Sequence, residues 1–300
     1  MRSVICAVAL LALPTSALAD GFNILRGTVP TYNWAGFYGG GQVGYTSSVI
    51  KFGTAAGPAV SFLLRGTAIE QDEQISDWNV LGNRQASSAS FGGFVGYNFE
   101  WENLILGLEL NYNRVSISSS TTNSIERSFS DSGGLPSGHN YFYTVNVAGT
   151  AAVHLTDVAT FRARAGIEDG NFLPYAFAGF ALARVSTSAS ATLMDGATDY
   201  PASESPPLTP LQYLCNGTAA FCTSITPAGT PTYVPGGPPL SQTNGQNNAF
   251  AYGVAAGLGV DVGILPNLFL RGELEYVYLA PVNGIQLSFG TARVGAGLKF

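Results

Sequence analysis

Charged residues are scarce in this sequence. Among 300 residues there are 13 Lys or Arg and 19 Asp or Glu, so the charged fraction is 11% and the formal net charge is −6. So few basic residues argue against a nucleic-acid partner. Long apolar runs are also missing beyond the N-terminus, which excludes a conventional transmembrane helix there. The mean hydropathy is nevertheless positive, at +0.20, so the apolar residues must be distributed in another way.

Residues that support catalysis or metal binding are equally rare. The chain has two His and three Cys, and it contains no zinc-ligand spacing, phosphate-binding loop or dinucleotide fingerprint. We therefore expect no metal, no cofactor, no catalytic residues and no enzymatic activity. The one enzymatic alternative is a lipid hydrolase that uses His154, which shares a strand face with the hydroxyl of Thr156.

Apolar residues instead recur at every second position, interleaved with glycine and polar residues. In the clearest segment Leu104, Leu106, Leu108 and Leu110 alternate with small or polar residues, which is typical of a strand with one lipid-facing side. Such segments occur eight times, at 34–47, 88–99, 104–113, 161–167, 173–185, 250–262, 268–278 and 289–300. This predicts an all-β fold, an eight-stranded antiparallel transmembrane barrel, with Phe300 closing it at an interfacial position.

Two expectations concern aromatic residues in these strands. Trp34 and Tyr45 are expected near the two membrane interfaces, where aromatic side chains form girdles. Tyr175 and Phe177 are expected to face outward, toward lipid.

The segments between the strands define the domain plan. Residues 1–19 read as a cleaved signal peptide, with Arg2, an apolar stretch and an Ala-Leu-Ala cleavage site. Residues 20–33 form a lead-in and residues 34–300 the barrel. Long extracellular loops are expected at about 48–87, 118–143 and 186–248, a shorter loop at 280–284, and short periplasmic turns at the second, fourth and sixth connections. The role of Tyr141–Leu155 stays open, as an extension of a strand or as a separate element.

The third long loop is rich in proline and holds two cysteines. In an oxidising exported compartment, the close pair Cys215 and Cys222 is most simply a local disulfide. A metal site there lacks further ligands.

Inward-facing charges are the most informative candidate site. Four of them, Glu109, Glu273, Arg162 and Arg293, reach a similar depth at about 3.3 Å rise per residue. Another three lie one pair of residues away: Arg164, Arg271 and Glu275. Because the interior of an eight-stranded barrel is just wide enough for side chains, we expect these seven residues to form a paired network in the lumen. It could be a static plug or an ion gate.

Several motifs together resemble one known family. They are NWAGFYGGGQVGY, FGGFVGYNFEWENLILGLEL, TFRARAGIEDGNFLPYAFAGFAL, NLFLRGELEYVYL and ARVGAGLKF, and they are similar to the small alphaproteobacterial porin-like, outer-membrane immunogenic proteins with an opacity-protein-like barrel. The resemblance implies a structural, surface-exposed barrel in the bacterial outer membrane. Implied partners are outer-membrane lipids, lipopolysaccharide and the barrel assembly machinery. The proline-rich loop departs from the family pattern.

Three functions therefore remain beside the hydrolase. The preferred one is a structural surface barrel whose lumen is largely plugged. The second is a narrow porin for small solutes. The third is an adhesin or recognition module that binds host or surface ligands through the long loops.

Overall fold

The computed structural model describes residues 32–131, 139–201, 232–235 and 238–300. The elements are β1 (Gly36–Lys51), α1 (Gly57–Leu63), α2 (Ala68–Glu73), η2 (Ile75–Asp77), β2 (Arg84–Trp101), β3 (Leu104–Asp131), β4 (His139–Ile167), β5 (Phe172–Pro201), β6 (Thr232–Pro235), β7 (Leu240–Leu265), β8 (Leu268–Leu279) and β9 (Gln286–Lys299). Within these residues no helix has the length and hydropathy needed to cross a bilayer.

Eight of the strands form a closed antiparallel ring. The hydrogen-bonded order is β4-β3-β2-β1-β9-β8-β7-β5, and an additional pairing between β4 and β5 closes it. Strand β6 is a short addition that pairs only with the far end of β5. The backbone N–H of Phe300 donates to the carbonyl of Phe37 at 2.9 Å, so the last residue is paired with the first strand. The predicted eight-stranded antiparallel barrel is confirmed.

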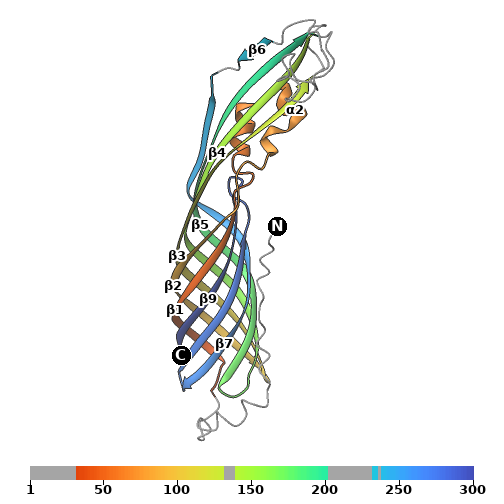
Figure 1. The fold of residues 1–300 in the computed structure, drawn as a ribbon. Coiled ribbons are helices and arrows are strands. Elements are labelled where there is room, and N and C mark those ends of the chain that lie inside the picture. Colours follow the sequence, from red (N-terminus) through yellow and green to blue (C-terminus); the bar gives the residue numbers. More distant parts are fainter. Residues whose placement is uncertain (1–31, 132–138, 202–231, 236–237) are drawn as a thin grey trace, which may run out of the picture.

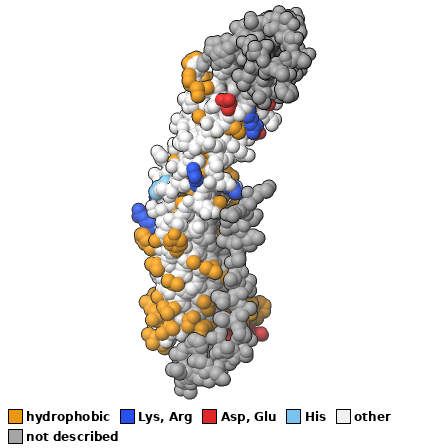
Figure 2. Space-filling view, viewed as in Figure 1, with side chains coloured by type: hydrophobic (Ala, Val, Ile, Leu, Met, Phe, Trp, Pro, Cys, Tyr) orange, Lys and Arg blue, Asp and Glu red, His pale blue; other side chains and the backbone are white. Residues whose placement is uncertain are grey.

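The outer wall of the barrel is apolar and carries two rings of aromatic residues. Figure 2 shows the hydrophobic side chains gathered over the lower half of the molecule. Exposed aromatics near the turns are Phe37, Phe99, Trp101, Phe172 and Phe300; those at the other end of the apolar wall are Tyr45, Phe91, Tyr112, Tyr252 and Tyr278. Two aromatic girdles that flank an apolar band are the pattern of a lipid-facing barrel.

Four strands continue far beyond this apolar wall. β3, β4 and β5 are 28, 29 and 30 residues long, whereas about 9–11 residues suffice to cross a bilayer. Their register shifts at one level, at Arg114/Ile117, Leu155/Asp157 and Val185/Thr187, and such bulges bend strands. We call the parts of β3, β4, β5 and β7 beyond these bulges the extension, which rises as a sheet above the barrel in Figure 1.

The extension corrects two of the expected loops. Much of 118–143 is strand, because β3 runs to Asp131 and β4 begins at His139, and 186–248 likewise contains the ends of β5 and β7. The Ser- and Thr-rich composition suggested loop, but cross-strand backbone pairing gives these residues strand structure whatever their polarity. Tyr141–Leu155 is part of β4, not a separate element.

The expected loop at 48–87 is also folded. Residues 52–83, here called the cap, contain α1, α2 and η2. Pro58 lies in the first turn of α1, where its missing N–H costs nothing. Phe52, Val60, Ile75 and Trp78 of the cap are buried in one core with the inner face of the extension. Alternation cannot predict this packing, because the cap has no strand period.

Some expectations lie outside the described residues. These are the signal peptide at 1–19, most of the lead-in at 20–33, and the Cys215–Cys222 disulfide.

Candidate functional site

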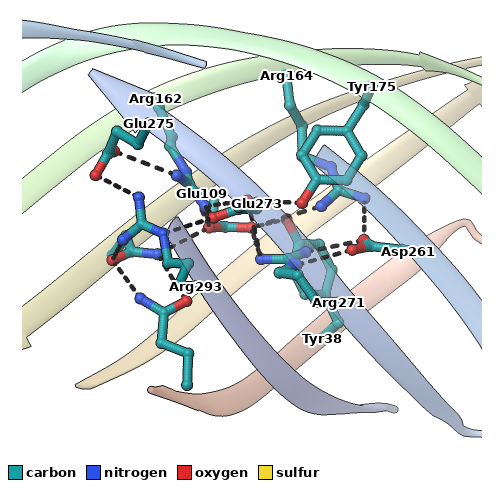
Figure 3. A network of polar contacts seen from close by, with 12 residues as sticks. Tyr38, Glu109, Arg162, Arg164, Tyr175, Asp261, Arg271, Glu273, Glu275 and Arg293 are labelled. Atoms are coloured by element: carbon teal, nitrogen blue, oxygen red, sulfur yellow. Dashed lines mark hydrogen bonds and ion pairs between the residues drawn. The ribbon is translucent and has the colours of Figure 1, made fainter. Parts of the chain in front are cut away.

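The barrel lumen holds a network of buried ionic side chains (Figure 3). All seven residues expected there are buried and point inward, and the structure brings in an eighth, Asp261 of β7. The network therefore contains four arginines and four carboxylates: Arg162, Arg164, Arg271, Arg293, Glu109, Asp261, Glu273 and Glu275. Its formal charge sums to zero, as burial away from water requires.

Strand register sets three of the ion pairs. Glu109 lies directly opposite Arg162 between β3 and β4, and Glu273 lies opposite Arg293 between β8 and β9. Asp261 is opposite Arg271 between β7 and β8. Side chains at directly paired positions on one face are close neighbours, so three of the acid–base pairs follow from the pairing of the strands.

Other bonds of the network cross the lumen. Arg162 Nη2 donates to Glu273 Oε1 at 2.7 Å and Oε2 at 2.9 Å, joining β4 to β8. Arg271 Nη1 donates to Glu109 Oε2 at 2.7 Å, joining β8 to β3, which lies on the far side of the ring. Such charge-assisted bonds are the stronger class of hydrogen bond, and here they connect opposite walls.

Asp261 holds two arginines at once. Arg271 donates to it from Nε at 2.8 Å and from Nη2 at 2.9 Å, and Arg164 Nη2 donates at 2.9 Å. Without Asp261 these two guanidiniums would share only Glu109, from which Arg164 Nη1 is 3.6 Å away. The inward alternation of β7 places Asp261 on the lumen face, but the network expected from sequence does not include it; its pairing with Arg271 across the β7–β8 turn brings it in.

Arg293 lies at the other side of the network. Its Nε is 3.0 Å from Glu273 Oε2 without the geometry of a hydrogen bond, and its Nη2 contacts Glu275. Its Nη1 donates to Asn111 Oδ1 at 3.3 Å. Gln42 and Asn113 continue this chain of side-chain bonds toward the extension, through Asn111.

Aromatic rings line the network. Tyr38 donates its hydroxyl to Glu109 at 2.8 Å and Tyr175 donates to Glu273 at 2.6 Å. The guanidinium of Arg162 lies 4.0 Å from the ring centre of Phe177. Tyr175 and Phe177 are thus buried in the lumen, and the expectation that they face lipid was wrong. Glycines on neighbouring strands, such as Gly259 beside Tyr175, leave the space that these rings occupy.

The turn end of the lumen is closed by a mostly aromatic cluster, which includes the rings that line the network. It consists of Tyr32, Trp34, Tyr38, Phe94, Ile105, Leu173, Tyr175, Phe177 and Phe269. Trp34 is only 3% exposed and its indole N–H donates to the carbonyl of Gly170 at 3.2 Å. Trp34 therefore plugs the barrel mouth and is not part of the lipid-facing aromatic girdle, which corrects that expectation. A cavity of only ≈ 10 Å³ is lined by residues of this layer together with Arg164 and Asp261, about the space of one water molecule.

Toward the opposite end of the lumen, the network is followed by the buried hydroxyls of Thr46, Ser90 and Thr291 and then by apolar side chains. Val115, Val158, Val277 and Phe289 are buried there in the core that also contains the cap. The ionic network thus lies between an aromatic layer and an apolar layer. An unpaired ion that crossed either layer would have to leave its hydration shell, at a cost of several kcal/mol.

His154, the residue considered for hydrolysis, lies outside the lumen. Its Nδ1 is 2.6 Å from the hydroxyl of Ser118, the residue opposite it on β3. The hydroxyl of Thr156, the partner expected from sequence, donates to the carbonyl of Arg184 at 3.4 Å instead. In the described part of the chain, no carboxylate hydrogen-bonds to His154, so the pair lacks the orienting acid of a hydrolytic triad.

Comparison with known proteins gives one family match. Residues 5–300 match the model of the outer membrane protein beta-barrel domain. No curated protein matches the chain.

Three of the solved structures that match the chain have low sequence identity and low TM-scores. Ail, the attachment invasion locus protein of Yersinia pestis, is 13% identical over 88% of this chain and 99% of its own, with a TM-score of 0.29. Neisserial surface protein A is 14% identical over 89% and 98%, with a TM-score of 0.30. The N-terminal barrel of Pseudomonas aeruginosa OprF is 11% identical over 86% and 97%, with a TM-score of 0.28.

Proposed function

The chain belongs to the outer membrane protein β-barrel domain family, and on this premise we propose that it is a closed structural barrel of the bacterial outer membrane. In this proposal the lumen is plugged, and the extension and the cap form the surface that the cell presents outside. The motif resemblance supports placing it among the small porin-like, immunogenic barrels, with lipopolysaccharide around the wall. It is not an enzyme in this reading.

One observation carries the proposal: a charge-neutral network that joins opposite walls lies between two apolar layers. Arg271 and Glu109 are each at most 3% exposed and bond across the ring at 2.7 Å. In a gate, these side chains would have to change ion-pair partners. Each change would leave a buried charge briefly unpaired, at a free-energy cost of about 3–5 kcal/mol. The static plug is therefore favoured over the gate, and the sealed barrel over the narrow porin.

The test is conductance of the refolded protein in a planar bilayer. Wild type is expected to be silent. Glu273→Ala is expected to remain silent as well, because the aromatic layer at Trp34 and the apolar layer under the cap still block the path. A variant that combines Glu273→Ala with Trp34→Ala, Phe289→Ala and replacement of residues 54–82 by a short Gly/Ser linker is expected to conduct, because it opens the network and both layers. Steady conductance of the wild type would overturn the proposal in favour of the porin.

The extension favours surface recognition as a second candidate function. Its outer face carries cross-strand hydroxyl pairs at hydrogen-bond distance, such as Thr122–Thr150 at 3.1 Å and Ser128–Thr144 at 3.0 Å, on strands far longer than a membrane span needs. A binding module would use this rigid sheet together with the chain beyond it. Cell attachment that survives shortening of β3, β4 and β5 to the level of the bulges would remove this candidate.

The hydrolase alternative has less support. Ser118 and His154 do meet, but on an open sheet face, and hydrolysis would need an acid and an oxyanion site that the contacts of His154 do not provide. Unchanged lipid acylation in cells that carry His154→Ala would remove it.

A further inference from the structure

Two arginines flank an aspartate at the boundary between the apolar wall and the extension. Arg114 of β3, Asp157 of β4 and Arg184 of β5 are directly opposite one another across three neighbouring strands. Arg184 Nη1 lies 3.7 Å from Asp157 Oδ2, and the hydroxyl of Tyr112 donates to Asp157 Oδ1 at 2.6 Å. Arg114 and Arg184 thus flank one carboxylate across three strands, with Arg184 within ion-pair distance of it, and two arginines against one aspartate give the cluster a net positive charge.

The height of this cluster is informative. Tyr112, two residues before Arg114 on the same face, belongs to the aromatic girdle away from the turns. Figure 2 shows basic side chains at the upper edge of the orange apolar band. Aromatic girdles mark the membrane–water interface, so the arginines lie where the phosphate groups of the outer leaflet are found.

A groove begins at the next row of residues. Ser118, His154 and Ser186 are the following cross-strand neighbours on β3, β4 and β5. With Ser120, Ser188 and Asn247 they line an open groove of ≈ 520 Å³. Hydroxyl, imidazole and amide groups can donate and accept hydrogen bonds, as the hydroxyls of a sugar require. The residues that line the groove include no carboxylate that would repel an anion.

We propose that this site binds a phosphorylated glycolipid headgroup of the outer leaflet. Its phosphate contacts Arg114 and Arg184, whose planar guanidiniums suit bidentate phosphate binding, and its sugar occupies the groove of Ser118, His154 and Ser186. The inference rests on the proposed outer-membrane location, but it does not depend on whether the lumen is closed. A phosphoglycerolipid offers the same phosphate without the sugar, so the groove distinguishes the two.

The test is a binding titration of the refolded full chain in detergent micelles with three probes. These are bisphosphorylated lipid A, dephosphorylated lipid A and phosphatidylglycerol. Wild type is expected to bind the first most tightly. Removing both arginines, as Arg114→Gln with Arg184→Gln, is expected to weaken lipid A binding by about tenfold for each arginine. The matched control is Lys51→Gln with Arg84→Gln, which removes two exposed cations elsewhere on β1 and β2 and is expected to leave the affinity unchanged.

The groove has its own variant. Ser118→Val with Ser186→Val suits the strand backbone and is expected to weaken lipid A binding but not phosphatidylglycerol binding. Equal affinity of wild type for both lipids would overturn the sugar half of the proposal, and an unchanged affinity of the arginine variant would overturn the phosphate half.

Competition by inorganic phosphate at the lipid's own phosphate concentration would mean that the site takes free phosphate and would overturn the lipid assignment. Far-ultraviolet circular dichroism and the heat-dependent gel shift check that every variant is folded. A wild type that conducts but still binds lipid A through the arginines would refute the closed barrel alone.

Discussion

Replacing Asp261 by Asn should destabilise the barrel strongly, although Asn has almost the same shape. The carboxylate of Asp261 accepts three hydrogen bonds from Arg164 and Arg271, and it is 1% exposed. The amide keeps one acceptor, turns two N–H donors toward guanidinium donors, and leaves the network with one unbalanced positive charge.

The size of this effect follows from burial. Removing one partner of a buried pair typically costs about 3–5 kcal/mol, which lowers the folding equilibrium constant by roughly two to three and a half powers of ten. The matched control is Asp157→Asn on the outer surface. The partner of Asp157, Arg184, has a side chain 49% exposed, and an exposed pair contributes about 0–1 kcal/mol.

The assay is urea unfolding of the refolded variants in lipid vesicles, followed by tryptophan fluorescence, with unfolding and refolding curves compared for reversibility. A second variant, Asp261→Asn with Arg164→Met, removes one charge of each sign and leaves three arginines against three carboxylates. It should recover part of the stability lost by Asp261→Asn alone, since the penalty arises from the unpaired charge. If Asp261→Asn costs no more than Asp157→Asn, or if the double variant is less stable than Asp261→Asn, the charge-balance reasoning is wrong.

Two further predictions concern packing and pH. Gly259→Ala would place a methyl group in the ring of Tyr175 and should cost about 1–3 kcal/mol of unfolding free energy, whereas Gly272→Ala meets only one side-chain atom at 3.9 Å and should be neutral in the same assay. In the turn after β4, burial and then the charge of Glu100 raise the pKa of Glu168. Because the folded state holds this proton more tightly than the unfolded chain, stability from this group falls as the pH rises from the ordinary glutamate pKa through the raised value. Glu168→Gln should therefore stabilise the protein at neutral pH and have no effect below about pH 4; an equal effect at both pH values would contradict this.

The strand pattern was readable from sequence because lipid imposes it. A lipid-facing wall must be apolar at every second residue. The pattern of segments such as Leu104–Leu110 therefore predicts both that they are strands and which of their faces is the outer one. The same alternation places all eight network residues on the inward face. The expected network nevertheless omits Asp261, because alternation gives the face of a residue but not its partner across the ring.

The rule failed where an aromatic residue fills the lumen. Size and hydrophobicity predict that Tyr175 and Phe177 face lipid, yet glycines on neighbouring strands, including Gly259, leave room for them inside. The same properties predict that Trp34 lies at the interface, whereas it fills the barrel mouth. Hydrophobicity alone cannot distinguish a lipid-facing ring from a lumen-filling ring, because both environments exclude water.

The sequence by itself determined the architecture: eight alternating strands, an apolar outer wall and inward charges of both signs. These follow from local periodicity and from the demands of the bilayer. The tertiary structure alone decided that Arg271 meets Glu109 across the ring, that Trp34 and the cap close the two ends, and that Arg114 and Arg184 flank Asp157 at the outer rim. Those contacts join residues far apart in the chain, and they depend on register, on bulges and on the space left by neighbouring side chains, none of which a local pattern encodes.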